Sequence, residues 1–84
     1  MAGKTLDILL DPGEAEGSEF TVSYWKVDPG QHLEKGDEIV ILESVEDKTA
    51  LAVLSPHSGT LAEILVSEEQ TVFAGDRLGR IEVD

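Results

Sequence analysis

The sequence predicts an all-β protein, a small barrel or sandwich built from short antiparallel strands. Runs rich in Val, Ile and Leu alternate with Gly, Pro and Asp, which is the pattern of many short strands joined by turns. No segment shows the apolar period of a convincing helix. With 84 residues the chain is long enough for one compact domain, residues 1–84, and too short for two.

The predicted strands follow one another at short intervals. They cover residues 5–10, 20–27, 38–45, 49–54, 59–66, 71–72 and 77–83. Glycine or proline separates most of them, at positions 28–30, 35–37, 55–59 and 74–76, where the backbone has to reverse. Residues 11–19 show no alternation and carry two glycines and four acids, so we expect a surface loop there.

An internal repeat divides the chain into two similar halves. Residues 27–43 align with residues 66–82 without gaps, and apolar residues recur at the same offsets. The identical pairs are Val27/Val66, Gln31/Gln70, Gly36/Gly75, Asp37/Asp76 and Glu43/Glu82. Each half is too small to bury its own sheet face, so the repeat predicts two small sheets packed together about an approximate two-fold axis.

Composition excludes several kinds of partner. A formal charge of −12 repels phosphate backbones and anionic lipids, which argues against nucleic-acid and membrane binding and favours basic protein partners. The chain has no cysteine for a disulfide or a thiolate metal site. No apolar run approaches the roughly 20 residues of a membrane span, so we expect a soluble, intracellular protein.

Motifs for catalysis and metal binding are missing from the sequence. It contains no nucleophile triad, phosphate-binding loop or zinc motif, and nothing pairs two carboxylates in an apolar pocket. His32 and His57 lack partners at metal-ligand spacing, so both are interpreted as exposed turn residues. Trp25 is interpreted as a packing residue. We therefore expect a protein that is not an enzyme and holds no metal.

The segment around Lys48 resembles the biotin/lipoyl attachment family, and in particular the lipoyl domains of 2-oxo acid dehydrogenase complexes. Asp47-Lys48-Thr49 lies between two predicted strands and is followed by Ser55-Pro56 and Gly59 at the offsets of that family. Residues 59–66 and 75–78 continue the similarity, and Gly13-Glu14, Trp25 and Gly30 extend it into the first half. The resemblance implies a barrel-sandwich hybrid fold and covers nearly the whole chain.

One departure from the family pattern lies just before Lys48. The interval from Asp37 to Lys48 is two residues longer than is usual, so counting forward from Asp37 places Glu46 at the modified position, whereas counting back from Ser55 places Lys48 there. Only Lys48 supplies an amine. Two added residues also preserve the alternation of a strand, because its side-chain period is two.

The resemblance implies that Lys48 carries covalent lipoate as a swinging arm. Such an arm carries acyl groups and reducing equivalents between a thiamine-dependent 2-oxo acid dehydrogenase, an acyltransferase and a dihydrolipoamide dehydrogenase, after a lipoate ligase or lipoyl transferase has attached it. The family also implies a monomeric carrier in the cytoplasm, or in the mitochondrial matrix of a eukaryote. Asp47, Glu46, Thr49 and Glu43 are the candidate recognition residues around the lysine.

Two alternatives remain on the sequence alone. A biotin carboxyl carrier domain uses the same fold with a lysine at the same distance from the proline, but it flanks that lysine with methionines, and the only methionine here is Met1. The lengthened interval before Lys48 would instead suit an unmodified β-barrel interaction domain. In either modified carrier the lysine amine serves as the acceptor of the cofactor's acyl group and not as a catalytic base.

Overall fold

The computed structural model describes residues 4–10 and 19–83, and eight strands make up its regular structure. The predicted loop at residues 11–19 falls mostly outside the described residues, and its last residue, Glu19, begins a strand. The strands are β1 (Thr5–Leu9), β2 (Glu19–Trp25), β3 (His32–Leu33), β4 (Glu38–Ser44), β5 (Ala50–Leu54), β6 (Gly59–Ile64), β7 (Thr71–Phe73) and β8 (Arg77–Val83).

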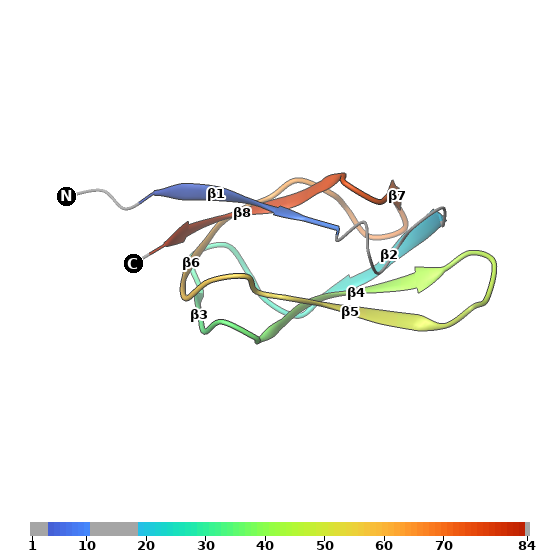
Figure 1. Ribbon diagram of the computed structural model, residues 1–84, viewed down its shortest axis with the longest axis horizontal. Coiled ribbons are helices and arrows are strands. Elements are labelled where there is room, and N and C mark those ends of the chain that lie inside the picture. The colour runs from blue at the N-terminus through green and yellow to red at the C-terminus, as the bar shows by residue number, and fades with distance from the viewer. Residues whose placement is uncertain (1–3, 11–18, 84) are drawn as a thin grey trace.

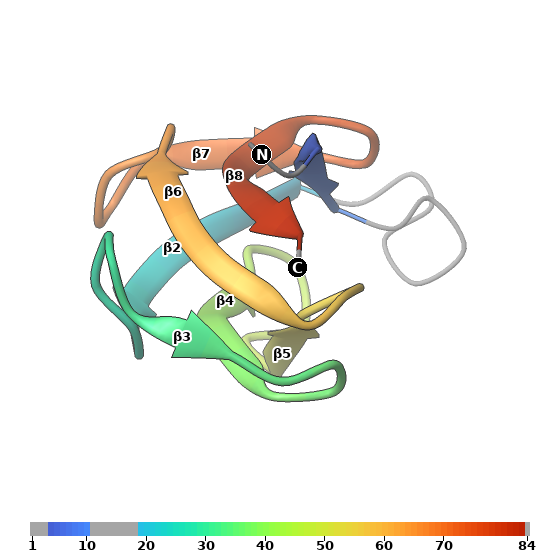
Figure 2. The same cartoon turned by 90° about the vertical axis from the view of Figure 1, so that its left-hand side faces the viewer.

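The strands form two four-stranded antiparallel sheets with equivalent topology. Sheet A has the order β1-β8-β6-β3, and sheet B has the order β5-β4-β2-β7. An offset of 39 residues, taken from the alignment of residues 27–43 with 66–82, carries β4, β2 and β3 onto β8, β6 and β7. Seen along the long axis, the strands surround a common interior (Figure 2). The all-β fold and its approximate two-fold symmetry are therefore confirmed.

The turns of the two halves are closed by the same hydrogen bonds, which explains why particular polar residues repeat. The Asp37 carboxylate accepts a hydrogen bond from the Glu34 N–H at 2.9 Å, and the Asp76 carboxylate accepts one from the Phe73 N–H at 2.8 Å. The side-chain oxygen of Gln31 likewise accepts from the backbone N–H of Asp28, as that of Gln70 does from Ser67. The repeated residues are thus structural, because they satisfy backbone donors at turns.

Paired β-bulges repeat at equivalent positions. The register between β2 and β4 shifts after Val22, and the register between β6 and β8 shifts after Leu61, which is 39 residues later. A second pair of bulges places Ile39 of β4 and Leu78 of β8 fully inside the core. Bulges increase twist, so both sheets curve around the same interior.

The core consists of aliphatic side chains and Phe20, drawn from both sheets. Inward positions alternate with outward ones along each strand, as expected for sheets with one buried face. The buried residues are Ile8, Leu10, Phe20, Val22, Val27, Leu33, Ile39, Val40, Leu42, Val53, Leu61, Val66, Val72, Leu78 and Ile81.

The sequence located seven of the eight strands and missed β3. That strand has only two residues and one buried side chain, Leu33, so it shows no alternation of its own. Several strand ends also differ from the prediction: Val27 and Val66 are buried but lie beyond the ends of β2 and β6, and Val45 lies in a turn. Apolar character predicts burial, but it does not reveal where strand hydrogen bonding stops.

The molecule is elongated, and one hairpin occupies the end opposite the termini. The β4–β5 hairpin projects at one end of the long axis, whereas β1 begins and β8 ends at the other (Figure 1). The principal extents are 44 × 21 × 19 Å. Among the described residues, no helix is long and apolar enough to cross a membrane.

Candidate functional site: the hairpin that carries Lys48

Lys48 lies in the five-residue connection, residues 45–49, that joins β4 to β5, directly after the turn at residues 45–47. The Ser44 N–H donates to the Thr49 carbonyl at 2.8 Å, and the Lys48 N–H donates to the Ser44 carbonyl at 2.8 Å, so these bonds close the hairpin. Lys48 has φ 61°, a left-handed conformation that most residues avoid. Its side chain is exposed, as the prediction of an amine at the tip of a projecting hairpin requires.

Ser44 anchors the turn from inside the sheet. It is only 3% exposed, and its hydroxyl oxygen accepts a hydrogen bond from the Asp47 N–H at 3.2 Å. The next residue, Val45, donates its N–H to the Glu19 carbonyl at 3.0 Å and so ties the turn to β2. The base of Lys48 is therefore fixed by backbone bonds to the buried end of β4, while its side chain extends into solvent.

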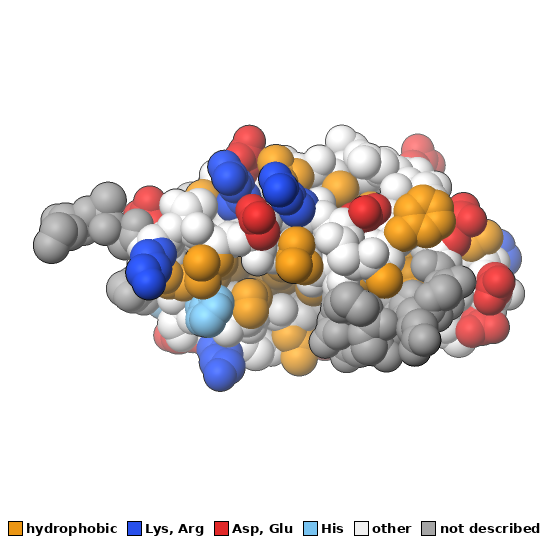
Figure 3. Space-filling view, turned by 45° about the horizontal axis from the view of Figure 1, so that its top comes forward, with side chains coloured by type: hydrophobic (Ala, Val, Ile, Leu, Met, Phe, Trp, Pro, Cys, Tyr) orange, Lys and Arg blue, Asp and Glu red, His pale blue; other side chains and the backbone are white. Residues whose placement is uncertain are grey.

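The candidate recognition residues all surround the lysine on exposed positions. Glu43 is the last outward residue of β4, Glu46 and Asp47 lie in the turn, and Thr49 follows the lysine. No ion pair joins Lys48 to another of the described residues. Acidic side chains collect at this end of the molecule (Figure 3). The arrangement presents one cation within a negatively charged surface, which attracts basic partners.

The two residues added before Lys48 do not interrupt the pairing of β4 with β5 next to the turn. From Val40 to Glu43, β4 pairs with β5 in unbroken register, and the bulge at Ile39 recurs at Leu78 in the other half. The added length therefore forms no bulge between Val40 and Glu43. Lys48 remains exposed in the connection that follows β4.

The Ser-Pro and Gly residues that contributed to the resemblance do not lie at the lysine. Ser55 is buried at the opposite end of β5, where its hydroxyl donates to the His57 carbonyl at 2.7 Å. A Cβ at Gly59 would lie 2.2 Å from the Glu82 carbonyl oxygen, so only glycine permits β6 and β8 to approach this closely. Ser55 and Gly59 therefore have structural roles away from Lys48.

Trp25 and the two histidines form no second candidate site among the described residues. Trp25 is half-buried against the core, and its indole N–H donates to the Val66 carbonyl at 3.0 Å, which confirms its interpretation as a packing residue. His57 is exposed in a bend and His32 is exposed on β3, not in a turn. In the part of the chain that the structure describes, no group of three or more His, Asp or Glu side chains is arranged to hold a metal ion.

Comparison with known families supports this assignment of the fold. Residues 10–81 match the biotin/lipoyl family profile, which is described as that of biotin-requiring enzymes. The chain is 36% identical over 64 residues to the dihydrolipoyllysine-residue succinyltransferase component of the 2-oxoglutarate dehydrogenase complex of Azotobacter vinelandii. It is also 36% identical over 67 residues to the lipoamide acyltransferase component of the branched-chain alpha-keto acid dehydrogenase complex of Bacillus subtilis.

These alignments cover 76% and 80% of this chain but only 16% and 15% of the two relatives. Among solved structures, a urea carboxylase from Kluyveromyces lactis has a TM-score of 0.78 at 23% identity, with 96% of this chain and 6% of that chain covered. This likeness concerns the fold alone.

The lipoyl domain of the Azotobacter vinelandii 2-oxoglutarate dehydrogenase complex is similar over its whole length. It has a TM-score of 0.68 at 32% identity, and the alignment covers 90% of this chain and 94% of that domain. The matching profile, the identity and the shared extent lead to one conclusion: this chain belongs to the lipoyl domains of the biotin/lipoyl attachment family.

Proposed function

We propose that residues 1–84 form one carrier domain, itself without catalytic activity, in which Lys48 bears covalently attached lipoate. The observation that carries the proposal is the position of Lys48: an exposed amine at the tip of a hairpin that projects from one end of a rigid pair of sheets. A fixed base and a free side chain are what a swinging arm requires.

Attachment converts the amine into an amide. After losing a proton to a base of the attaching enzyme, Nζ attacks the carbonyl carbon of an activated lipoyl group. A C–N bond forms, and the activating group leaves with its bonding electron pair. One cation is lost, so the formal charge changes from −12 to −13. The dithiolane then supplies the acyl and electron chemistry, while the domain supplies its position.

The partners of the proposed carrier follow from the relatives, which are components of 2-oxo acid dehydrogenase complexes. They are a lipoate ligase or lipoyl transferase, a thiamine-dependent dehydrogenase, an acyltransferase and a dihydrolipoamide dehydrogenase. The carrier acts as a monomer in the cytoplasm, or in the mitochondrial matrix of a eukaryote. Glu43, Glu46, Asp47 and Thr49 form the surface that these partners meet first.

Lipoate is proposed over biotin because the lipoyl domain from Azotobacter vinelandii shares 32% identity with the chain over nearly its whole length. Coexpression with a lipoate ligase and, separately, with a biotin ligase distinguishes the two cofactors by intact mass. We expect one lipoyl group per chain with the first enzyme and an unmodified chain with the second. Addition of biotin alone would favour a biotin carrier, and an unmodified chain in both cases would favour an interaction domain.

Substitution at Lys48 tests the site. Lys48→Ala is expected to abolish lipoylation and to leave the thermal transition unchanged, because an exposed turn side chain contributes little to stability. Lys35→Ala is the matched control, since Lys35 is also exposed in a turn of the same half. Lipoylation that persists in Lys48→Ala would place the attachment site on another lysine.

A further inference from the structure

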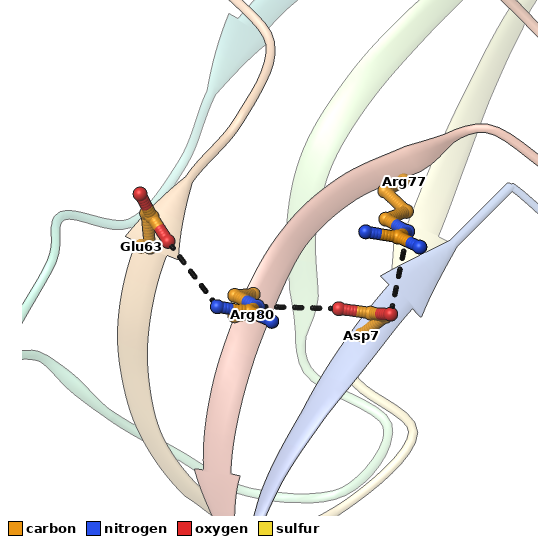
Figure 4. Close-up of polar contacts among 4 residues, drawn as sticks. All are labelled: Asp7, Glu63, Arg77 and Arg80. Carbon is orange, nitrogen blue, oxygen red and sulfur yellow. Dashed lines mark hydrogen bonds and ion pairs between the residues drawn. The ribbon is translucent and has the colours of Figure 1, made fainter.

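The outer faces of the two sheets differ at equivalent positions. On sheet A, Asp7, Arg80 and Glu63 lie side by side on β1, β8 and β6. Arg80 Nε lies 3.3 Å from Asp7 Oδ1, and Arg80 Nη1 lies 3.9 Å from Glu63 Oε1 (Figure 4). We call these three residues the ionic row. Arg77 adds a further contact, 3.5 Å from Asp7 Oδ2.

Sheet B carries an uncharged row at the equivalent place. The register pairs Tyr24 of β2 with Ile41 of β4, and Ile41 with Ala52 of β5. Tyr24 and Ile41 precede Glu63 and Arg80 by 39 residues, and Ala52 pairs with Ile41 as Asp7 pairs with Arg80. We call these residues the apolar row. Tyr24 is 48% exposed, and Leu54, which lies on the edge strand β5 with Ala52, is 51% exposed.

Charged residues border the apolar row on the hairpin side and on the opposite side. Glu43 is the next outward residue of β4 toward the turn. On the other side, Lys26 Nζ donates to Glu38 Oε1 at 2.7 Å, and this hydrogen bond raises the pKa of the Lys26 amine. The Lys26–Glu38 pair has no net charge. The net charge next to the apolar row is therefore the negative charge of Glu43, on the side of the row nearer to Lys48.

A second copy of the chain is a poor occupant of this surface. Each copy carries a formal charge of −12, so two copies repel each other. The surface instead fits a brief contact with a protein that places apolar groups on the row and cations around Glu43.

The length of the Lys48 side chain determines which enzyme has to approach the hairpin closely. An enzyme that modifies Nζ has to admit the unmodified side chain, so its surface must contact the hairpin itself. A standard footprint of about 800 Å² is roughly 30 Å across. Ile41 lies three residues before Ser44, or about 10 Å along the strand at the usual rise. A footprint centred on the hairpin therefore includes the apolar row, whereas an enzyme that receives the loaded arm can remain at a distance.

We propose that the apolar row is the docking surface for the enzyme that attaches lipoate to Lys48. The inference rests on the function proposed above and adds the face of the domain that this enzyme contacts. Sheet A, whose equivalent face carries the ionic row, remains outside the contact.

Lipoylation kinetics test the proposal. Initial rates are measured with a purified ATP-dependent lipoate ligase from the same cell while the concentration of the domain is varied. Tyr24→Thr and the double variant Tyr24→Thr/Ile41→Thr keep β-branched residues suited to strands. We expect the double variant to raise the KM for the domain about tenfold with kcat within about twofold, because docking contacts are lost and the reacting amine is unchanged.

The matched control is Arg80→Ala, which lies at the two-fold position of Ile41 on the other sheet. It is expected to leave the KM for the domain unchanged. Thermal melting verifies that each variant is folded. If the double variant unfolds, the KM of Tyr24→Thr alone tests the docking surface. A KM that is unchanged in the folded Tyr24 variant, or raised equally by Arg80→Ala, overturns the docking surface while Lys48 is still modified. A wild-type domain that the ligase does not modify overturns the proposed function and this inference together.

Discussion

The two halves of the chain share their backbone and differ in what they expose. In the first half, β4 continues into the turn that holds Lys48, and its counterpart in the second half is β8. One outer face carries an apolar row, and the other carries an ionic row. The comparison teaches that the repeated features maintain the fold, while the proposed function lies where the halves depart from each other.

The largest expected loss of stability comes from Gly59, where β6 approaches β8 closely. Gly59→Ala would place a Cβ 2.2 Å from the Glu82 carbonyl oxygen, and that backbone atom cannot move aside without disturbing the pairing of β6 with β8. We expect a destabilisation of about 3 kcal/mol. Urea unfolding measures it. A loss below about 1 kcal/mol would mean that the two strands have room to separate.

Equivalent turn aspartates give the sharpest test of the symmetry. Asp37 and Asp76 each accept a backbone N–H three residues earlier, at 2.9 and 2.8 Å. Asp37→Ala and Asp76→Ala should each cost about 1–2 kcal/mol, because each leaves a turn donor without its charged acceptor. Urea unfolding of the two variants should agree within about 0.5 kcal/mol. Clearly unequal losses would show that the turns are not energetically equivalent.

Ser44 tests the turn that follows β4 in the first half. Ser44→Ala removes the buried acceptor for the Asp47 N–H and should cost about 1 kcal/mol. It should also slow lipoylation of Lys48, because the turn loses one of its anchors. Ser44→Thr keeps the hydroxyl and serves as the control. Equal lipoylation rates for wild type and Ser44→Ala would mean that the backbone bonds alone position the lysine.

Gly30 and Glu69 occupy equivalent positions in the two halves, and both have a positive φ angle. Gly30 has φ 92° and Glu69, its counterpart, has φ 70°. Gly30→Ala should destabilise by about 1 kcal/mol, since a side chain is strained there although no atom lies within 4 Å of its Cβ. Glu69→Gly should change stability by less than about 0.5 kcal/mol, because relief of strain is offset by greater freedom of the unfolded chain. Thermal melts of both variants measure the two stability changes. An unchanged melting temperature for Gly30→Ala would show that a side chain is not strained at position 30.

The smallest effect is expected on the ionic row. Asp7→Ala removes contacts to Arg77 and Arg80 at exposed positions and should cost less than about 1 kcal/mol. The difference from wild type should shrink as salt is added, because exposed charges are screened. Melting curves at low and high ionic strength measure it. A large, salt-independent loss would assign the row a structural role that solvent-exposed ion pairs rarely have.

The repeat and the turn residues allowed the fold to be predicted, because glycine, proline and alternation act locally. The two-residue strand β3 was not predicted, although the alignment of Leu33 with Val72 makes it the counterpart of β7. The exposure of Lys48 was also predicted. The left-handed conformation of Lys48 and the buried hydroxyl of Ser44 were not, because they depend on hydrogen bonds across the hairpin that no sequence pattern encodes.

The contrast between the outer faces required the strand register. Tyr24, Ile41 and Ala52 are far apart in the sequence, and single exposed apolar residues are ordinary on a protein surface. Only the pairing of β2, β4 and β5 places them side by side. Gly59 is a similar case, since its close approach to β8 is a property of two strands and not of its own segment.

The proposed function depends on the presentation of Lys48 for attachment, despite the two added residues before it. The most direct measurement is the mass of the domain isolated from its own cell, followed by fragmentation of the peptide that contains residue 48. The structure predicts one lipoyl group, carried on Lys48. An unmodified peptide in cells that lipoylate their other carriers, or a lipoyl group on another lysine, would contradict the claim.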